Sequence, residues 1–192
     1  MRRVVFLALI WLAGLTVASA DPRWQAVVDK IEAAHDYAFH YDYRGEEGTY
    51  SFSYQAVPKV PMVRTEILEG SSRGVGTVIF YDAKLSTEYV QMKTSFLTLR
   101  RSITSRDIED TSLYIPLFQQ LVDRMAKAKL TASSATGDTW TFVFQDESFR
   151  HELEADIESN ELRAYRRYAK DKLLESLTFG PIRWNSDPTL GL

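Results

Sequence analysis

Histidines, acidic side chains and serines are the residues of this chain that could support catalysis or bind a metal. His35 and His40 flank a change from helical to strand-like spacing, so they share no face, and His151 is remote in sequence. No G-x-S-x-G elbow is present, and the Ser, His and Asp residues show no spacing that indicates a catalytic triad. The sequence therefore predicts no catalytic residue, no metal site and no cofactor, and we expect a protein that is not an enzyme.

Acidic side chains alternate along one predicted strand. Glu152, Glu154 and Asp156 would share a face, where they could bind calcium if further oxygens converged on it. Such an alternation more commonly marks the solvated outer face of a sheet. Both interpretations stay open, with the outer face favoured.

Two further patterns lack the context that a ligand site requires. The glycine-rich segment 70–76 matches neither the Walker pattern nor G-x-G-x-x-G, and it joins two predicted strands, so we expect a hairpin loop there. Arg100-Arg101 and Arg166-Arg167 are pairs, and the aromatic residues lie on another segment. No nucleic-acid surface is expected.

The composition excludes several classes of site and partner. The 192 residues include no cysteine, which excludes a disulfide scaffold, a thiolate metal site and a cysteine nucleophile. Lys and Arg number 23 against 26 acidic residues, and this net charge of −3 gives no reason to expect nucleic acid as a partner.

The N-terminal segment has the features of a secretory signal peptide. Arg2 and Arg3 precede an apolar run over 4–15, and Ala18-Ser19-Ala20 supplies a small-residue cleavage site. The run is shorter than the roughly 20 residues that span a bilayer. We therefore expect cleavage after Ala20, a single domain over 21–192, and a periplasmic protein. Because Asp21 and not Cys follows the cut, no lipid anchor is expected.

Two segments have helical spacing. Asp21-Pro22 suits an N-cap followed by proline at the first helical position, and apolar residues then recur at helical intervals from Trp24 to Ala34. Leu117, Leu121, Val122 and Met125 share a face of a second predicted helix that begins near Pro116.

The rest of the chain has strand-like alternation. Aromatic residues occupy every second position from Tyr37 to Tyr43 and from Tyr50 to Tyr54, on either side of the turn at 45–48, which predicts a hairpin with one aromatic face. Further strands are expected at 60–68, 76–81, 88–92, 96–101, 129–133, 140–145, 151–157, 162–170 and 173–179, with an irregular tail over 184–192. This pattern predicts an α+β fold, an antiparallel sheet of about ten strands with an N-terminal and a mid-chain helix.

Two short helices cannot cover so large a sheet. A sheet with surplus apolar surface closes on itself, dimerises or encloses a ligand. The pattern alone leaves two possibilities open, a simple packed core and a cavity for a hydrophobic ligand.

Several segments resemble a known family. The strand pair containing Gly48-Thr49-Tyr50, the stretches 58–67 and 76–82, and the ending 177–185 are similar to those of the LolA/LolB-like family of outer-membrane lipoprotein-sorting proteins. The resemblance implies an unclosed antiparallel β-barrel, a half-barrel, around an apolar cavity with helices as a lid. It also implies non-catalytic binding of lipids or lipoprotein acyl chains in the periplasm and their transport or sorting to the outer membrane.

On this basis we expect the aromatic face to line a ligand cavity. Its predicted lining is Phe39, Tyr41, Phe52, Tyr54, Ile67, Phe80, Phe142 and Phe144 from the strands, with Leu121 and Met125 from the second helix. The expected partners are lipid or lipoprotein acyl chains, with inner- or outer-membrane transport proteins as further candidates, and we expect a monomer.

Two other functions remain as alternatives. One is an envelope signalling or scaffold module of the same fold, with a solid or ligand-free interior, that binds a membrane-protein partner through Arg100-Arg101 or the tail 184–192. The other is a hydrolase, which would need carboxylate or serine chemistry that no motif indicates.

Overall fold

The computed structural model describes residues 21–46, 48–70, 74–86, 89–94, 96–102, 114–187 and 190. The predicted signal peptide over 1–20 lies outside these residues. Among the helices described, none combines the length and apolar character needed to cross a membrane.

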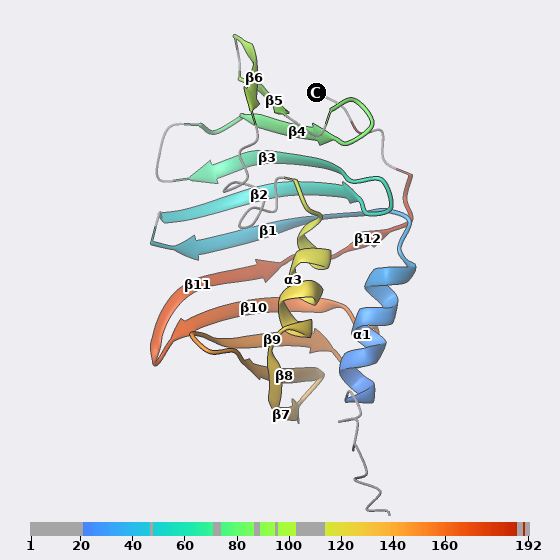
Figure 1. Ribbon diagram of the computed structural model, residues 1–192, viewed down its shortest axis with the longest axis vertical. Helices are drawn as coiled ribbons and strands as arrows, with labels where there is room; N and C mark the ends of the chain where they lie inside the picture. Colours follow the sequence, from blue (N-terminus) through green and yellow to red (C-terminus); the bar gives the residue numbers. More distant parts are fainter. Residues whose placement is uncertain are drawn as a thin grey trace, which may run out of the picture.

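One antiparallel sheet forms the framework (Figure 1). Its strands are β1 (Tyr37–Gly45), β2 (Gly48–Val57), β3 (Met62–Gly70), β4 (Val78–Asp82), β5 (Tyr89–Lys93), β6 (Thr98–Ser102), β7 (Lys129–Thr136), β8 (Thr139–Gln145), β9 (Arg150–Asp156), β10 (Leu162–Ala169), β11 (Lys172–Phe179) and β12 (Arg183–Trp184). The order is β6-β5-β4-β3-β2-β1-β11-β10-β9-β8-β7, and β12 pairs with β1. Among the described residues, β6 and β7 are the two edge strands of the sheet, so the barrel stays open.

Alternation along the strands separates two faces of the sheet. Tyr37, Phe39 and Tyr41 of β1 are buried in the hydrophobic core, whereas the intervening His40 and Asp42 are exposed. We call the face that carries these aromatic residues and both helices the inner face. The unclosed antiparallel sheet covered by two helices confirms the predicted half-barrel of the α+β class.

Helix α1 (Pro22–Ala33) begins as its sequence predicts. The Asp21 carboxylate accepts a hydrogen bond from the Arg23 N–H at the N-cap, and proline occupies the first turn. Trp24 on its buried face packs edge-on against Phe142 and Phe144 of β8, with ring centroids 5.5 and 5.1 Å apart. Helix α1 therefore covers the inner face over the β8 end of the sheet.

The tail after β11 begins with a short strand. Trp184, which was predicted to start the irregular segment, lies in β12 and pairs with Tyr37 of β1. The Trp184 ring packs on Tyr37 and Phe118, and its Nε1 donates to Glu161, 2.9 Å away. Trp184 alone departs from the prediction, because a two-residue strand has no period that a sequence could reveal, and the described residues that follow it, 185–187 and 190, are irregular.

A buried carboxylate holds the tail against the junction of α1 and β1. Asp36 is 1% exposed and accepts hydrogen bonds from the backbone N–H groups of Ser186 (2.9 Å) and Asp187 (3.2 Å). His35 Nδ1 lies 3.0 Å from the same carboxylate. Burial raises the pKa of Asp36, but these hydrogen bonds outweigh it and leave the pKa below its ordinary value.

We predict that Asp36→Asn lowers the free energy of unfolding by about 2 kcal/mol, because an amide NH₂ would replace one of the two buried oxygens that accept from the N–H groups of the tail. Urea denaturation at neutral pH measures this loss. Since the folded-state pKa is depressed, the contribution of Asp36 is complete above about pH 4 and is lost as the pH falls through the folded pKa.

The matched control is Asp187→Asn, an exposed carboxylate in the same tail. We expect it to change stability by less than about 0.5 kcal/mol. Equal effects of the two variants would contradict the assigned role of Asp36.

Candidate functional site

Helix α3 (Leu117–Ala126) packs its buried face on the aromatic residues of the inner face. The Phe118 ring lies 4.7 Å from Phe39, 4.8 Å from Tyr37 and 5.3 Å from Phe179, measured between centroids. Phe118 is fully buried, and Leu121 and Met125 follow it into the core. Beneath α3 the half-barrel is therefore filled by its own side chains.

The sheet supplies the cap that α3 lacks. Pro116 occupies the N-cap and makes no side-chain cap, so the first N–H groups of the helix need acceptors from elsewhere. The Leu117 N–H donates to the Tyr54 hydroxyl (2.9 Å), and the Phe118 N–H donates to the Tyr37 hydroxyl (3.3 Å). Burial raises the pKa of both phenols, which therefore stay protonated.

The inner face changes character beyond α3. The strand register aligns Tyr54, Thr65, Ile79, Met92 and Leu99 in one row across β2 to β6. Tyr54 and Thr65 are buried, Ile79 and Met92 are half-buried, and Leu99 is 48% exposed. Neither helix extends over β4 to β6 (Figure 1). We call the last four of these residues, from Thr65 to Leu99, the open row.

Most of the predicted lining residues lie in the packed region. Seven of them lie in the packed core, namely Phe39, Tyr41, Tyr54, Leu121, Met125, Phe142 and Phe144. Phe52 packs on Tyr41 with centroids 4.8 Å apart and is half-buried, and Ile67 pairs with it across the strands. Phe52 and Ile67 thus lie at the boundary between the packed and open parts of the face.

Phe80 does not join this set. Across β3 and β4 it lies opposite Arg64, whereas its neighbours Ile79 and Tyr81 contact the core. Phe80 therefore belongs to the outer face, where Leu85 and Tyr89 adjoin it. The predicted strand 76–81 carries apolar residues at consecutive positions, so its sequence does not show which side chains face inward. For this reason Phe80 was placed incorrectly in the lining.

Two tyrosines at the ends of β1 and β2 lie over glycines. A Cβ at Gly45 would collide with the Tyr43 phenol, and one at Gly70 would collide with the Tyr50 ring. The two tyrosine rings lie 6.3 Å apart, and Tyr50 lies 5.9 Å from Phe52. An aromatic surface therefore continues from Phe52 to the β1–β2 turn.

Polar side chains occupy the inner face next to this turn. The register aligns Gly45, Glu175, Arg167 and His151 across β1, β11, β10 and β9. Arg124 reaches them from the C-terminal part of α3, donating to the Tyr165 hydroxyl at 2.8 Å. Sequence reasoning missed this group, although Glu175 and Arg167 occupy inward positions in the alternation of their strands.

His151 is fixed within the group and is 1% exposed. Its Nε2 lies 2.8 Å from the Asp146 carboxylate and its Nδ1 lies 3.0 Å from the Tyr165 hydroxyl. Burial lowers the pKa of His151 despite the Asp146 contact, so the imidazole is neutral at pH 7. Because ionised Asp146 can only accept, Nε2 carries the proton and Nδ1 accepts from Tyr165. Burial raises the pKa of Tyr165 to about 12.

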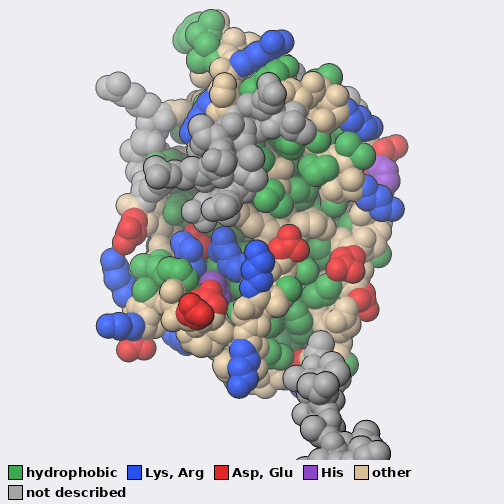
Figure 2. Space-filling model, viewed as in Figure 1, with side chains coloured by type: hydrophobic (Ala, Val, Ile, Leu, Met, Phe, Trp, Pro, Cys, Tyr) green, Lys and Arg blue, Asp and Glu red, His purple; other side chains and the backbone are tan. Residues whose placement is uncertain are grey.

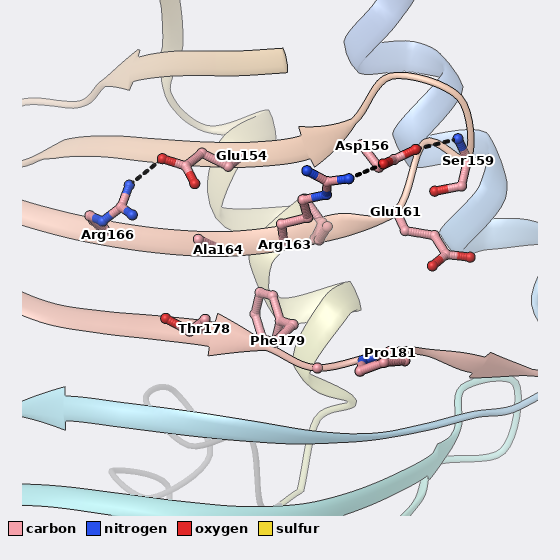
Figure 3. A pocket seen from close by; sticks show the side chains of 12 residues that line it. Glu154, Asp156, Ser159, Glu161, Arg163, Ala164, Arg166, Thr178, Phe179 and Pro181 are labelled. Carbon is pink, nitrogen blue, oxygen red and sulfur yellow. Dashed lines mark hydrogen bonds and ion pairs between the residues drawn. The ribbon is translucent and has the colours of Figure 1, made fainter. Parts of the chain in front are cut away.

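The acidic alternation of β9 lies on the outer face beside a hollow of about 460 Å³ (Figure 3). Arg166 donates to Glu154 at 2.5 Å, Arg163 pairs with Asp156, and Glu152 accepts from Arg150. Guanidinium groups thus neutralise these carboxylates. This outer-face arrangement agrees with the favoured interpretation and offers calcium no convergent set of unpaired oxygens among these three residues.

Among the described residues, one cluster of potential metal ligands occurs, at the tail. Ligand atoms of His35, Asp36 and Asp187 lie within 4.8 Å of one another. The Asp36 oxygens already accept the hydrogen bonds that hold the tail, so we interpret this cluster as structural.

No protein-family model matches the sequence, and no curated protein sequence matches it. Among solved structures, an uncharacterized conserved protein from Thermus thermophilus is similar to it with a TM-score of 0.54 at 14% identity, over 84% of this chain and 87% of that chain. This likeness shows a shared fold.

Two other structures align over 88% of this chain with lower scores. A DUF1329 family protein from Desulfovibrio piger has a TM-score of 0.43 at 10% identity, over 94% of its length. MucB in a structure of the Pseudomonas aeruginosa MucA/MucB complex has a TM-score of 0.48 at 13% identity, over 59% of its length.

We predict that Tyr54→Phe lowers the free energy of unfolding by about 1–3 kcal/mol, because it leaves the buried Leu117 N–H without its acceptor. Hydrogen exchange should accelerate most in the first turn of α3. Denaturant unfolding together with exchange mass spectrometry measures both effects.

Tyr89→Phe, on the outer face of β5, is the control, and we expect it to leave α3 exchange unchanged. If Tyr54→Phe also left the exchange of α3 at the wild-type rate, the phenol would not be the cap of this helix.

Proposed function

We propose that this protein binds the apolar chain of a lipid or of a lipid-modified protein in the periplasm, without catalysis. The observation that carries the proposal is the open row, in which Ile79, Met92 and Leu99 extend the aromatic inner face past the helices. The row is continuous with the half-buried Phe52 and Ile67. An extended hydrocarbon chain laid across it would remove these side chains from water.

The energetics favour a long apolar ligand. Each methylene that leaves water contributes about 0.8 kcal/mol, so even a chain of moderate length offsets the cost of its own ordering. Thr65 Oγ1 lies within the row, buried and with no hydrogen-bond partner among the described residues. An isolated polar atom of this kind can orient a ligand that is otherwise apolar.

The chemistry of the described residues supports binding over catalysis. His151 has the Asp146 contact that orients a general base, but its other nitrogen takes the Tyr165 hydroxyl and the ring is shielded from solvent. A substrate could not reach it without disrupting the network.

The N-terminal sequence supports the proposed location. The basic pair, apolar run and small-residue site over 1–20 have the order of a secretory signal. Carrying or sorting lipoproteins or lipids to the outer membrane is the specific role we propose, since such cargo carries the acyl chains that the open row suits.

A second candidate function is a scaffold that binds a membrane-protein partner, and the exposed strand β6 favours it. All five residues of β6 are exposed, and Phe96, which precedes it, is 97% exposed. An exposed strand at a sheet edge is a common site of strand addition. Recovery of the same envelope protein by a crosslinker at Arg100, and its loss with Thr98→Pro, a change in β6 outside the open row, would support this function over the carrier.

We predict that the wild-type protein binds a fluorophore-labelled long-chain fatty acid, and that Met92→Glu weakens this binding about tenfold or more, because a charge enters the apolar row. Gln91→Glu places the same charge one residue away on the outer face and should bind as the wild type does.

Native mass spectrometry of protein purified gently from periplasm provides the second readout, and we expect a mass increment from a bound lipid. Detection of the apo mass alone, together with no binding of the probe, would contradict the carrier function.

A further inference from the structure

The turn between β5 and β6 presents two adjoining apolar side chains to solvent. Phe96 is 97% exposed and Leu97 is 55% exposed. The Thr94 N–H and hydroxyl both donate to the Leu97 carbonyl, at 2.9 and 3.3 Å, so hydrogen bonds close the turn that carries them. Large apolar side chains left in water together mark a candidate contact surface.

The turn lies at an extremity of the molecule. β5 and β6 are at one end of its longest axis, at the top of Figure 1, and all five residues of β6 are exposed. Figure 2 shows hydrophobic and basic side chains together at this end. The turn can therefore meet a flat surface before either helix does.

The hairpin of β5 and β6 is basic in a protein whose overall charge is negative. Residues 89–102 contain Lys93, Arg100 and Arg101 and no acidic residue, whereas the whole chain has a net charge of −3. Lys93 and Arg100 are exposed, and the Arg100 guanidinium lies over the Tyr89 ring, 4.8 Å from its centroid. A partner that fits this hairpin combines negative charge with an apolar layer.

The order of these residues along the hairpin matches the layers of a phospholipid bilayer. Lys93 is the last residue of β5, and Arg100 lies three residues beyond Leu97, roughly 10 Å along an extended strand. Apolar side chains of surface-bound proteins enter the boundary between headgroups and acyl chains by roughly 5–10 Å. With Phe96 and Leu97 at that depth, the long basic side chains reach the lipid phosphates.

We propose that the β5–β6 turn docks on an anionic phospholipid bilayer, with Phe96 and Leu97 in the interface and Lys93 and Arg100 at the lipid phosphates. Docking goes beyond the proposed function and does not depend on it. One consequence does rest on that function. Leu99, two residues after Leu97, begins the open row by pairing with Met92, so an acyl chain drawn from the bilayer would enter the row there.

Flotation with phospholipid vesicles tests the proposal. We expect the wild-type protein to bind vesicles of equimolar phosphatidylcholine and phosphatidylglycerol about tenfold or more tightly than vesicles of phosphatidylcholine alone, because exposed basic side chains are attracted to an anionic surface. The preference should fall as the salt concentration rises, because salt screens exposed charges. A wild-type protein that does not bind the mixed vesicles would overturn the proposal.

Phe96→Glu places a charge at the tip of the turn, so it should weaken binding to the mixed vesicles about tenfold or more. Leu85→Glu is the matched control, because Leu85 is 65% exposed in the β4–β5 turn, at the other end of β5. It should bind as the wild type does. Equal binding by Phe96→Glu and the wild type contradicts insertion of the tip. Circular dichroism establishes that both variants are folded.

The basic side chains have their own test. Lys93→Gln combined with Arg100→Gln should abolish the preference for mixed vesicles over phosphatidylcholine vesicles. Lys84→Gln, which removes an exposed lysine from the β4–β5 turn, should keep the preference. If the double variant keeps it too, Lys93 and Arg100 are not at the lipid phosphates.

Insertion also has a spectroscopic signature. Phe96→Trp should shift its fluorescence to shorter wavelength when mixed vesicles are added and should be quenched by brominated lipid, whereas Leu85→Trp should show neither change. If Phe96→Trp is unchanged by vesicles, and a crosslinker at position 96 instead captures a second copy or an envelope protein, the turn is a protein contact and the proposal is wrong.

Binding of the labelled fatty acid in solution separates this proposal from the proposed function. Phe96→Glu should bind the probe as the wild type does, because Phe96 lies outside the open row. If the wild type binds the mixed vesicles but not the probe, the carrier function fails and the docking surface stands. If it binds the probe but not the vesicles, docking alone is overturned.

Discussion

The N-terminus of α3 depends on two phenol oxygens that the sheet provides. A helix that starts at Pro116 has no side-chain cap of its own, and its first N–H groups are buried, so they must be satisfied by whatever lies beneath them. Tyr54 and Tyr37 do this from adjacent strands. This contact places α3 over β1 and its neighbours and determines which part of the inner face is covered.

The rest of the inner face follows from that placement. Phe118 inserts among Tyr37, Phe39 and Phe179, and α1 adds Trp24 over β8, so the covered half forms an ordinary close-packed core. Beyond α3 the strand alternation continues, and neither of the described helices lies over β4 to β6. Along the open row the inner face is half-buried at Ile79 and Met92 and exposed at Leu99.

The sequence was sufficient to predict the helices and strands, but not the face of every residue or the long-range hydrogen bonds. The Asp21-Pro22 start, the hairpin of alternating tyrosines and phenylalanines, and the helix beginning at Pro116 are each determined by local spacing, and the structure confirms them. The face of Phe80 was assigned wrongly, because apolar residues occupy consecutive positions in its strand. The hydrogen bonds of Asp36 with the tail and of Tyr54 and Tyr37 with α3 were not predicted. Each of them joins residues 60 or more positions apart that carry no common motif.

The inner face becomes polar at the end next to the β1–β2 turn. Close to the β1–β2 turn the core ends, and the inward positions of β11 and β10 carry Glu175 and Arg167 in place of apolar residues. Arg124 reaches Glu175 and the Tyr165 hydroxyl from the C-terminal part of α3. Because α3 is positioned by Tyr54 and Tyr37 at its other end, these contacts of Arg124 depend on the same two phenols that cap the helix.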